Sequence, residues 1–169
     1  MYDFGCAHLF IFWGINVEIY RVSFIGHREI YPLTYIEDQL ESIVRGLLYQ
    51  KEYVEFYVGR NGDLDISAAS AIKRAQKALG NHNSSLILVL PYPAKDQKYY
   101  REFYDEVYLP IDRKTHFKAA ITKRNEWMID HSDLLIAYVK HSHGGAYKAL
   151  LYAEMKGIKI NNICLSFVK

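Results

Sequence analysis

The chain has 169 residues, of which 50% are hydrophobic and 24% charged, and these are ordinary values for one globular domain. Its formal net charge is only +2, and lysines and arginines alternate with acidic residues along the chain. The sequence therefore has no basic stripe for a nucleic-acid backbone and no acidic tail, and it disfavours a nucleic-acid partner. The 15 tyrosines suit half-buried pocket walls and subunit contacts.

Cys6 and Cys164 lie near opposite ends of the chain and have no CxxC spacing. This spacing argues against a zinc site and against a disulfide framework. Reduced thiols in a cytoplasmic protein are the simplest interpretation.

The N-terminal segment contains an apolar run from Cys6 to Ile15. Asp3 precedes this run and no Lys or Arg does, which differs from a secretory signal peptide. Glu18 then interrupts the run before the roughly 20 apolar residues that a membrane span needs. We expect no membrane association, and we interpret residues 1–16 as an appended segment that packs on a surface or on a partner subunit.

The first strand is expected at Ile19–Ile25, which is rich in β-branched and aromatic residues and ends at Gly26-His27-Arg28. A helix over Thr34–Tyr49 follows, with a capping-box pattern at Thr34 and Glu37. Its apolar stripe consists of Ile36, Leu40, Ile43, Val44 and Leu47.

The second strand, Val54–Val58, ends in the glycine-containing loop 59–62, and a helix over Asp65–Leu79 begins with Asp65 as its N-cap. The third strand, Ser85–Leu90, is almost wholly apolar, as expected of a strand that is covered on both faces, and Pro91-Tyr92-Pro93 ends it.

Two helical patterns follow, over Asp96–Tyr108 and over Thr115–Asp130. In the second of these, Phe117, Ile121, Arg124 and Met128 lie near one face. The chain ends with a strand at Asp133–Val139, a helix at Ala146–Lys156 that Gly157 stops, and a strand at Ile158–Phe167.

Alternation of strands and helices predicts a single-domain α/β fold: a three-layer, Rossmann-like, doubly wound and mostly parallel sheet of five strands. Ligands of such sheets bind at the carboxyl ends of the strands, where the strand order reverses. With the strand order 3-2-1-4-5, the reversal lies between the first and fourth strands. The loops at Gly26 and at Gly145 would then be neighbours.

The residues at this edge favour an anion such as phosphate. Gly144-Gly145 precedes a helix whose free N–H groups and dipole attract negative charge, and glycine lets the backbone approach closely. Arg28 and Arg124 could add bidentate contacts to phosphate oxygens. A nucleotide, a nucleotide sugar or a dinucleotide would suit such a pocket.

Five motifs in order carry a resemblance to a known family: VSFIGHRE at 22–29, FYVGRNGDLD at 56–65, LILVLPY at 86–92, RNEWMIDHSDLLIAY at 124–138 and GGAYKALLYAEMKG at 144–157. Together they resemble the YpsA branch of the SLOG superfamily, a Rossmann-like group that includes the DNA-processing protein DprA and the Lonely Guy (LOG) cytokinin-activating enzymes. The resemblance covers residues 17–169.

The resemblance implies a domain that binds a nucleotide or a nucleotide derivative, such as an ADP-ribose or NAD-type ligand. Some related domains sense such signals in bacterial or phage conflict systems. Together with the loops above, it gives these candidate ligand-binding residues: Gly26, His27, Arg28, Gly59, Asp65, Pro91, Tyr92, Arg124, Asn125, Met128, His143, Gly144 and Gly145.

The LOG enzymes cleave the N-glycosidic bond of nucleoside monophosphates, and they use an arginine and a PGGxGTxxE loop. Arg124 matches the arginine, but His143 replaces the proline and Leu150 stands near the position of the catalytic glutamate. Glu154, one turn later, could substitute only if it faces the pocket. Without a carboxylate to activate water or to stabilise an oxocarbenium-like centre, such cleavage has little support.

Each of these residues also has a purely structural interpretation. Arg124 could form an internal ion pair with Asp65, Asp130 or Asp133, and Gly144-Gly145 could simply permit a tight turn. His141 and His143 alternate like metal ligands but have no third ligand at a fitting spacing.

Met128 and Trp127 are better explained as core residues than as a platform for a base. The sequence thus favours a cytoplasmic protein that binds a nucleotide-derived small molecule, without a cofactor or a metal, and that forms a homo-oligomer. The alternative is a LOG-like hydrolase with Arg124 and Glu154 as its catalytic candidates.

Overall fold

The computed structural model of the protein describes residues 16–80, 82–94, 97–112 and 114–164. The strands are β1 (Ile19–Gly26), β2 (Tyr53–Val58), β3 (Ser84–Val89), β4 (Glu106–Tyr108), β5 (Leu134–Tyr138) and β6 (Lys159–Asn162). The helices are α1 (Leu33–Gln50), α2 (Asp63–Leu79), α3 (Gln97–Phe103), α4 (Phe117–Asp130) and α5 (Gly144–Lys156).

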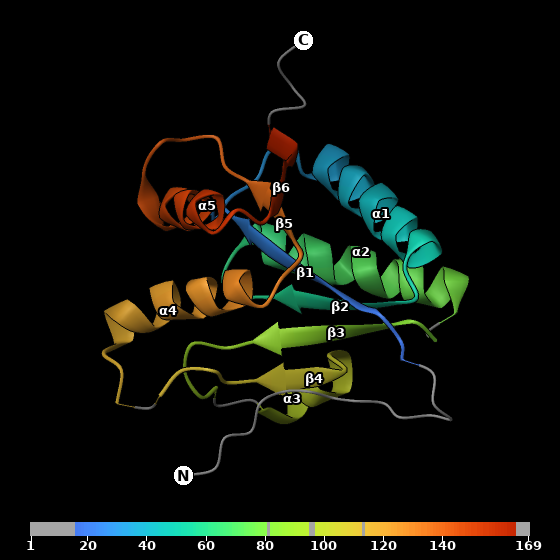
Figure 1. Ribbon diagram of the computed structural model, residues 1–169, viewed down its shortest axis with the longest axis horizontal. Coiled ribbons are helices and arrows are strands. Elements are labelled where there is room, and N and C mark those ends of the chain that lie inside the picture. Colours follow the sequence, from blue (N-terminus) through green and yellow to red (C-terminus); the bar gives the residue numbers. More distant parts are fainter. Residues whose placement is uncertain (1–15, 81, 95–96, 113, 165–169) are drawn as a thin grey trace.

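The strands form one six-stranded parallel sheet in the order β4-β3-β2-β1-β5-β6 (Figure 1). The predicted single-domain, Rossmann-like α/β fold is thereby confirmed, and so is the predicted order of its five long strands. The order reverses between β1 and β5, which are paired from Val22–Leu134 to Gly26–Tyr138. The carboxyl ends of these two strands therefore meet where the sequence predicts the ligand site.

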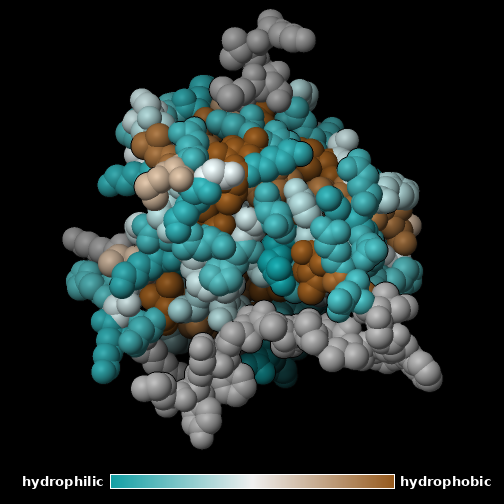
Figure 2. Space-filling model, viewed as in Figure 1, coloured by the Kyte–Doolittle hydropathy of each residue, from teal (hydrophilic) through white to brown (hydrophobic). Residues whose placement is uncertain are grey.

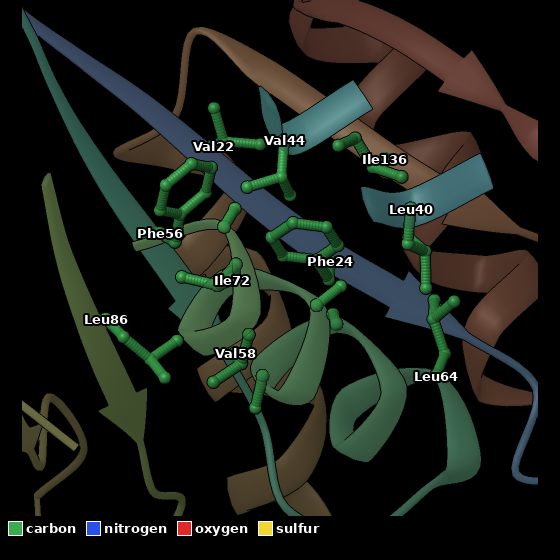
Figure 3. Packing of buried hydrophobic residues seen from close by; sticks show 14 of the residues in the cluster. Val22, Phe24, Leu40, Val44, Phe56, Val58, Leu64, Ile72, Leu86 and Ile136 are labelled. Carbon is green, nitrogen blue, oxygen red and sulfur yellow. The ribbon is translucent and has the colours of Figure 1, made fainter. Parts of the chain in front are cut away.

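Helices α1 and α2 cover one face of the sheet and form the larger core with it. Alternate residues of each strand point to this face, because successive side chains of a strand point to opposite sides. Figure 3 shows Phe24 of β1 and Phe56 of β2 packed among aliphatic side chains from α1 and α2. Ile36, Leu40 and Val44 of the predicted stripe on α1 are wholly buried here, which confirms the helical period.

Helices α4 and α5 pack on the opposite face. Ile129 of α4 and Ala153 of α5 are buried against Ile25 and Leu135 of the sheet. Met128 of α4 is buried against Tyr57, Ile87 and Val89 of β2 and β3. Met128 is thus a core residue, as its structural interpretation predicted.

The prediction of one helix over Asp96–Tyr108 was wrong. The chain forms the short helix α3 there and then the edge strand β4, which pairs with β3 from Ile87–Glu106 to Val89–Tyr108. The last strand is also shorter than predicted: β6 ends at Asn162, and residues 165–169 lie outside the described residues.

Two predicted helix caps were wrong. Helix α1 begins at Leu33 after Pro32 and has no side-chain cap, so Thr34 and Glu37 do not form a capping box. Glu37 instead accepts a hydrogen bond from Ser67 of α2 (3.3 Å). Helix α2 begins at Asp63, two residues before the predicted start, which frees the Asp65 carboxylate for the loop that precedes the helix.

The surface is mostly hydrophilic in the view of Figure 2, with hydrophobic residues in separate patches between the charged ones. In the described part of the chain, no helix is long and apolar enough to cross a membrane. Cys164 is a half-buried free thiol that packs against the larger core. Residues 1–15, and with them almost all of the predicted appended segment, lie outside the described residues.

Candidate ligand-binding site

The loops after β1 and β5 meet at the carboxyl edge of the sheet, as the strand order predicts. The backbone N–H of His27 donates to the carbonyl of Tyr138 (3.1 Å). In return, the imidazole Nε2 of His27 accepts hydrogen bonds from the backbone N–H groups of Lys140 (2.9 Å) and His141 (3.1 Å). His27 therefore ties the two loops together across the point where the strand order reverses.

This role of His27 requires a neutral ring, because an imidazolium has no lone pair to accept a hydrogen bond. Burial lowers the pKa of His27, and the nearby His141 and His143 lower it further. The ring of His141 lies 5.1 Å from that of His27 between centroids. The structure thus assigns His27 a contact within the protein that the sequence did not predict.

The loop after β2 is organised by Asp65. Its carboxylate accepts hydrogen bonds from the backbone N–H of Gly59 (3.0 Å) and from that of Asn61 (3.2 Å). The backbone N–H of Asp63 donates to the carbonyl of Arg28 (2.8 Å), which joins the loops after β1 and β2. Asp65 therefore satisfies loop amides from inside the first turn of α2, instead of acting as the N-cap.

Arg124 of α4 lies buried at the carboxyl ends of β2 and β3, with only 5% of its surface exposed. Its Nη1 donates to the carbonyl of Val89 (3.3 Å) and contacts the sulfur of Met128 (3.8 Å). Its buried Nε has no hydrogen-bond partner. A buried N–H of a charged group without an acceptor is costly.

Arg124 reaches this place because residue 59 is a glycine. A Cβ at position 59 would overlap Nη1 of Arg124 and would stand 2.8 Å from Oδ2 of Asp65. The guanidinium and the carboxylate thus both border the space over Gly59. Of the three aspartates that the sequence offered as ion-pair partners of Arg124, Asp65 is the one whose charge acts on it.

Asp130 and Asp133 have other partners. Asp130 pairs with Lys156 (2.7 Å), and Asp133 accepts a hydrogen bond from the backbone of Arg21 (2.7 Å). Neither aspartate neutralises Arg124.

The charges of Arg124 and Asp65 compensate each other only in part. Burial lowers the pKa of Arg124 although the negative charge of Asp65 opposes the change. Burial likewise raises the pKa of Asp65, although Arg124 and the loop amides oppose it. For both groups the loss of water outweighs the attraction of the opposite charge.

The N-terminus of α5 is open. Gly144 adopts a positive φ of 87°, and a Cβ at Gly144 or Gly145 would have nothing within 4 Å. The preceding residue, His143, makes no side-chain cap, and the first turn contains no acidic residue. The first N–H groups of α5 therefore remain available to an anion, whereas the first turn of α2 contains the carboxylates of Asp63 and Asp65.

Some of the other predicted residues lie near Arg124, and others do not. Tyr92 lies close enough to Arg124 to interact with its charge, and its ring packs on Phe117 at 5.0 Å. Pro91 is buried beside it, and Asn125 is half-buried next to Arg124 on α4.

Three other predicted residues are not among the neighbours of Arg124 described above: Gly26, Arg28 and Glu154. Gly26 lets β1 approach Leu64, whose Cδ2 would stand 2.6 Å from a Cβ at position 26. Arg28 is exposed, and so is Glu154, which lies in the last turn of α5.

The rings of His141 and His143 are stacked 5.5 Å apart. Among the described residues, however, no group of three or more potential metal ligands gathers anywhere in the fold. The two histidines border the open N-terminus of α5 and are exposed.

Sequence reasoning missed several contacts that shape this edge of the sheet. The hydroxyl of Tyr138 donates to the carbonyl of Tyr31 (2.9 Å) and thereby holds the segment after β1 against β5. The carbonyl of Val89 and the amide of Asn61 also contact the site residues. Backbone groups leave no signal in the sequence, and the Tyr31–Tyr138 contact joins residues that are 107 positions apart.

Comparison with known proteins gives structural matches only, because no family model matches the sequence and no curated protein does. The structure is similar to DNA processing protein A (DprA) from Helicobacter pylori, with a TM-score of 0.60 and 18% identity over 83% of this chain and 63% of that one. That protein is described as binding single-stranded DNA.

The structure is also similar to DprA from Streptococcus pneumoniae, with a TM-score of 0.54 and 13% identity over 87% of this chain and 60% of that one. The molybdenum cofactor carrier protein of Chlamydomonas reinhardtii gives a TM-score of 0.54 and 13% identity over 85% of this chain and 75% of that one.

The chain spans less than two thirds of the length of either DprA structure. At these identities the likeness shows a common Rossmann-like fold.

Proposed function

We propose that the protein binds a nucleotide-derived small molecule at the carboxyl edge of its sheet. One observation carries the proposal: Arg124 is almost fully buried, yet its Nε has no acceptor and its charge is only partly neutralised. A ligand oxygen that accepts from Nε would satisfy the N–H and add negative charge beside the guanidinium. Phosphate and ribose oxygens both fit this description.

The two ends of the site suit different parts of such a ligand. The open N-terminus of α5 at Gly144 and Gly145 suits a phosphate, because a Cβ at either glycine would have open space around it and the first turn contains no carboxylate. Asp65 next to Arg124 suits hydroxyl groups, which can donate to the remaining lone pairs of its carboxylate. The ring of Tyr92 beside Arg124 offers a flat face for a base.

The YpsA-like resemblance supports the same class of ligand and adds the role of a sensor or of a ligand-sequestering protein. The alternative function, cleavage of a nucleotide N-glycosidic bond, needs a carboxylate at the reacting carbon. Glu154 lies ten residues after Gly144 on α5, which is about 15 Å along the helix axis. It is also exposed, so its position argues against a catalytic role at this edge.

The first test measures the thermal stability of the protein with AMP, ADP, ADP-ribose, NAD and a single-stranded oligonucleotide. A ligand that binds the native state raises the melting temperature in proportion to the logarithm of its concentration above Kd. Chromatography after incubation then shows whether the ligand is recovered intact. We expect stabilisation by at least one of the small nucleotides and recovery of that nucleotide unchanged.

The matched variants are Arg124→Met and Arg74→Met. Arg124→Met fills a similar volume without the guanidinium, whereas Arg74 is exposed on α2 and pairs with Glu41 (2.7 Å) away from this edge. Loss of a charged hydrogen bond costs about 1.5–3 kcal/mol. We therefore expect Arg124→Met to raise Kd by roughly tenfold to a hundredfold and Arg74→Met to leave it unchanged.

Three results would count against the proposal. Stabilisation by the oligonucleotide alone would favour a DprA-like role, and free base in the chromatogram would favour the hydrolase. Equal stabilisation of the wild type and Arg124→Met would remove Arg124 from the site.

A further inference from the structure

Half of one face of the sheet has no helix over it in the described part of the chain. Helices α1 and α2 pack on the opposite face against β1, β2, β3 and β5, and α4 and α5 bury β1, β5 and the carboxyl-terminal half of β3. Toward the starts of β2, β3 and β4, Tyr53 and Ser85 are only half-buried and Glu106 is exposed. Parallel sheets are normally covered on both faces, so this region lacks a covering element.

A groove of about 550 Å³ occupies this region. Its floor is formed by alternate residues of the strands, including Tyr53, Tyr57 and Ile87, and its end is closed by Trp127 of α4. The ring of Trp127 packs against Tyr57 at 5.6 Å and against Tyr108 at 4.8 Å. The groove is therefore walled by aromatic and aliphatic side chains.

Two of the three carboxylates that line the groove, those of Glu55 and Asp105, already have partners, and the third, that of Glu106, is exposed. Glu55 pairs with Arg21 (2.9 Å) and accepts a hydrogen bond from the hydroxyl of Tyr57 (2.8 Å). Asp105 pairs with Lys73 (2.9 Å) and accepts from the backbone of Leu86 (2.7 Å). With these carboxylates neutralised, the groove offers mainly apolar surface, and an apolar occupant suits it best.

We propose that the N-terminal segment of this same chain, residues 1–15, fills the groove and supplies the missing cover. The chain leaves the described structure inside the groove, because Asn16 and Val17 both line it. Every residue from Cys6 to Ile15 except His8 and Gly14 is hydrophobic, and the segment contains no Lys or Arg. The segment that begins at the groove thus matches its chemistry.

The segment is also long enough. Fifteen extended residues reach about 50 Å, whereas β1 and β4 are three strand spacings apart, or about 14 Å. Burial of its aromatic side chains against Tyr53, Ile87 and Trp127 would remove two exposed apolar surfaces from water at once. This docking is independent of any ligand at the carboxyl edge.

Cys6 allows a direct test in the full-length chain. With Cys164→Ser, a nitroxide spin label attached to Cys6 is the single paramagnetic centre. We expect it to broaden the amide resonances of groove residues such as Tyr53, Ser85 and Ile87 to less than half of their diamagnetic intensity. Resonances of α1 residues on the opposite face, such as Val44, should keep their intensity.

Two controls sharpen the result. The matched label on Cys164, with Cys6→Ser, lies against the larger core and should leave the groove resonances sharp. Ser85→Arg places a long cation in the groove and should abolish the broadening from the Cys6 label, while the far-ultraviolet circular dichroism stays that of the folded chain.

A mixing experiment separates the chain's own segment from that of a second copy. Isotope-labelled chains without a spin label are combined with unlabelled chains that carry the nitroxide on Cys6. We expect no broadening in this mixture. Broadening in the mixture would assign the groove to the segment of another chain, and absence of broadening in the singly labelled chain would leave the groove without this occupant; either result overturns the proposal.

Discussion

The Nη1 atom of Arg124 occupies the space that a side chain at position 59 would take, directly over the backbone of Gly59. This relationship joins α4 to the end of β2 and brings a buried guanidinium next to Asp65. It also explains why a glycine without a positive φ stands at this position: space, and not backbone conformation, requires it.

The first prediction follows from this geometry. Gly59→Ala should destabilise the protein by about 1–3 kcal/mol, because the new methyl group forces Arg124 and Asp65 out of their present positions in a packed region. Urea unfolding followed by circular dichroism measures the change in the free energy of unfolding.

Gly46→Ala is the matched control, because Gly46 lies inside α1, more than a turn from its end, and a Cβ there would have nothing within 4 Å. Alanine should stabilise this helix by about 0.5–1 kcal/mol. A Gly59→Ala protein as stable as the wild type would mean that Arg124 does not occupy the space over Gly59.

The second prediction concerns pH and His27. Burial lowers the pKa of His27 in the native state below the ordinary histidine pKa of about 6.5. At a pH between the native and the ordinary pKa, His27 of the unfolded chain binds a proton and His27 of the native chain does not. The contribution of His27 to the free energy of unfolding should therefore be fully present above about pH 6.5. As the pH falls below this value, the free energy of unfolding should decrease. Unfolding in urea at a series of pH values measures this slope.

His27→Gln isolates the contribution of this residue from that of the other histidines. The glutamine side chain does not titrate, so the decrease in stability below pH 6.5 should be smaller than in the wild type. The variant should also lose about 1 kcal/mol at pH 7.5, because the ring no longer accepts from Lys140 and His141. Equal pH slopes for the two proteins would exclude His27 as the titrating group.

The third prediction separates stability from binding at the start of α5. Gly145→Ala adds a methyl group in open space, so stability should stay within about 0.5 kcal/mol of the wild type. The same methyl group would stand where a phosphate approaches the helix N-terminus, so nucleotide affinity should fall. Isothermal titration with the nucleotide that stabilises the wild type measures the loss.

Gly144→Ala should behave differently. Gly144 has a φ of 87°, a left-handed conformation that costs an alanine about 1–2 kcal/mol. Full affinity in Gly145→Ala would argue that the phosphate does not bind at this helix.

The sequence predicted the fold well because the long elements have strong periods. Residues that face the core are apolar, and their spacing along the sequence therefore indicates the type of element. This holds for the apolar runs of β3 and β5 and for the apolar stripe of α1. The assumed strand order 3-2-1-4-5 agrees with the structure, and so does the expected meeting of the loops, at His27 and His141.

Strand β4 escaped prediction because three residues are too few to show a period of two. The stretch Glu106–Tyr108 follows a helix and looks like its continuation, and its role as a strand comes from pairing with β3. The contacts of Glu37 and Asp65 were not predicted for a related reason. Each carboxylate could cap the start of its own helix, but in the structure it accepts hydrogen bonds from other groups. Such choices depend on neighbours that are distant in sequence or on loop geometry.

The groove over β2 to β4 could not be read from the sequence either. Tyr53, Tyr57 and Ile87 are residue types typical of buried strands. Their neighbours in the sequence do not indicate that this part of the sheet has no helix over it among the described residues. That fact depends on where the connection from β4 places α4 across the sheet. The burial of Arg124 is similar: its position on an apolar face was visible in the sequence, but the lack of an acceptor for Nε was not.

The most direct measurement of the central claim is the nuclear magnetic resonance signal of the Arg124 Nε–H group. In isotope-labelled protein this signal is assigned by its absence from Arg124→Met, and it is followed during titration with AMP, ADP-ribose and NAD. The account predicts that at least one of these ligands shifts the signal saturably, with the same midpoint as the thermal stabilisation. A signal that stays in place at saturating concentrations of a ligand that stabilises the protein would contradict it.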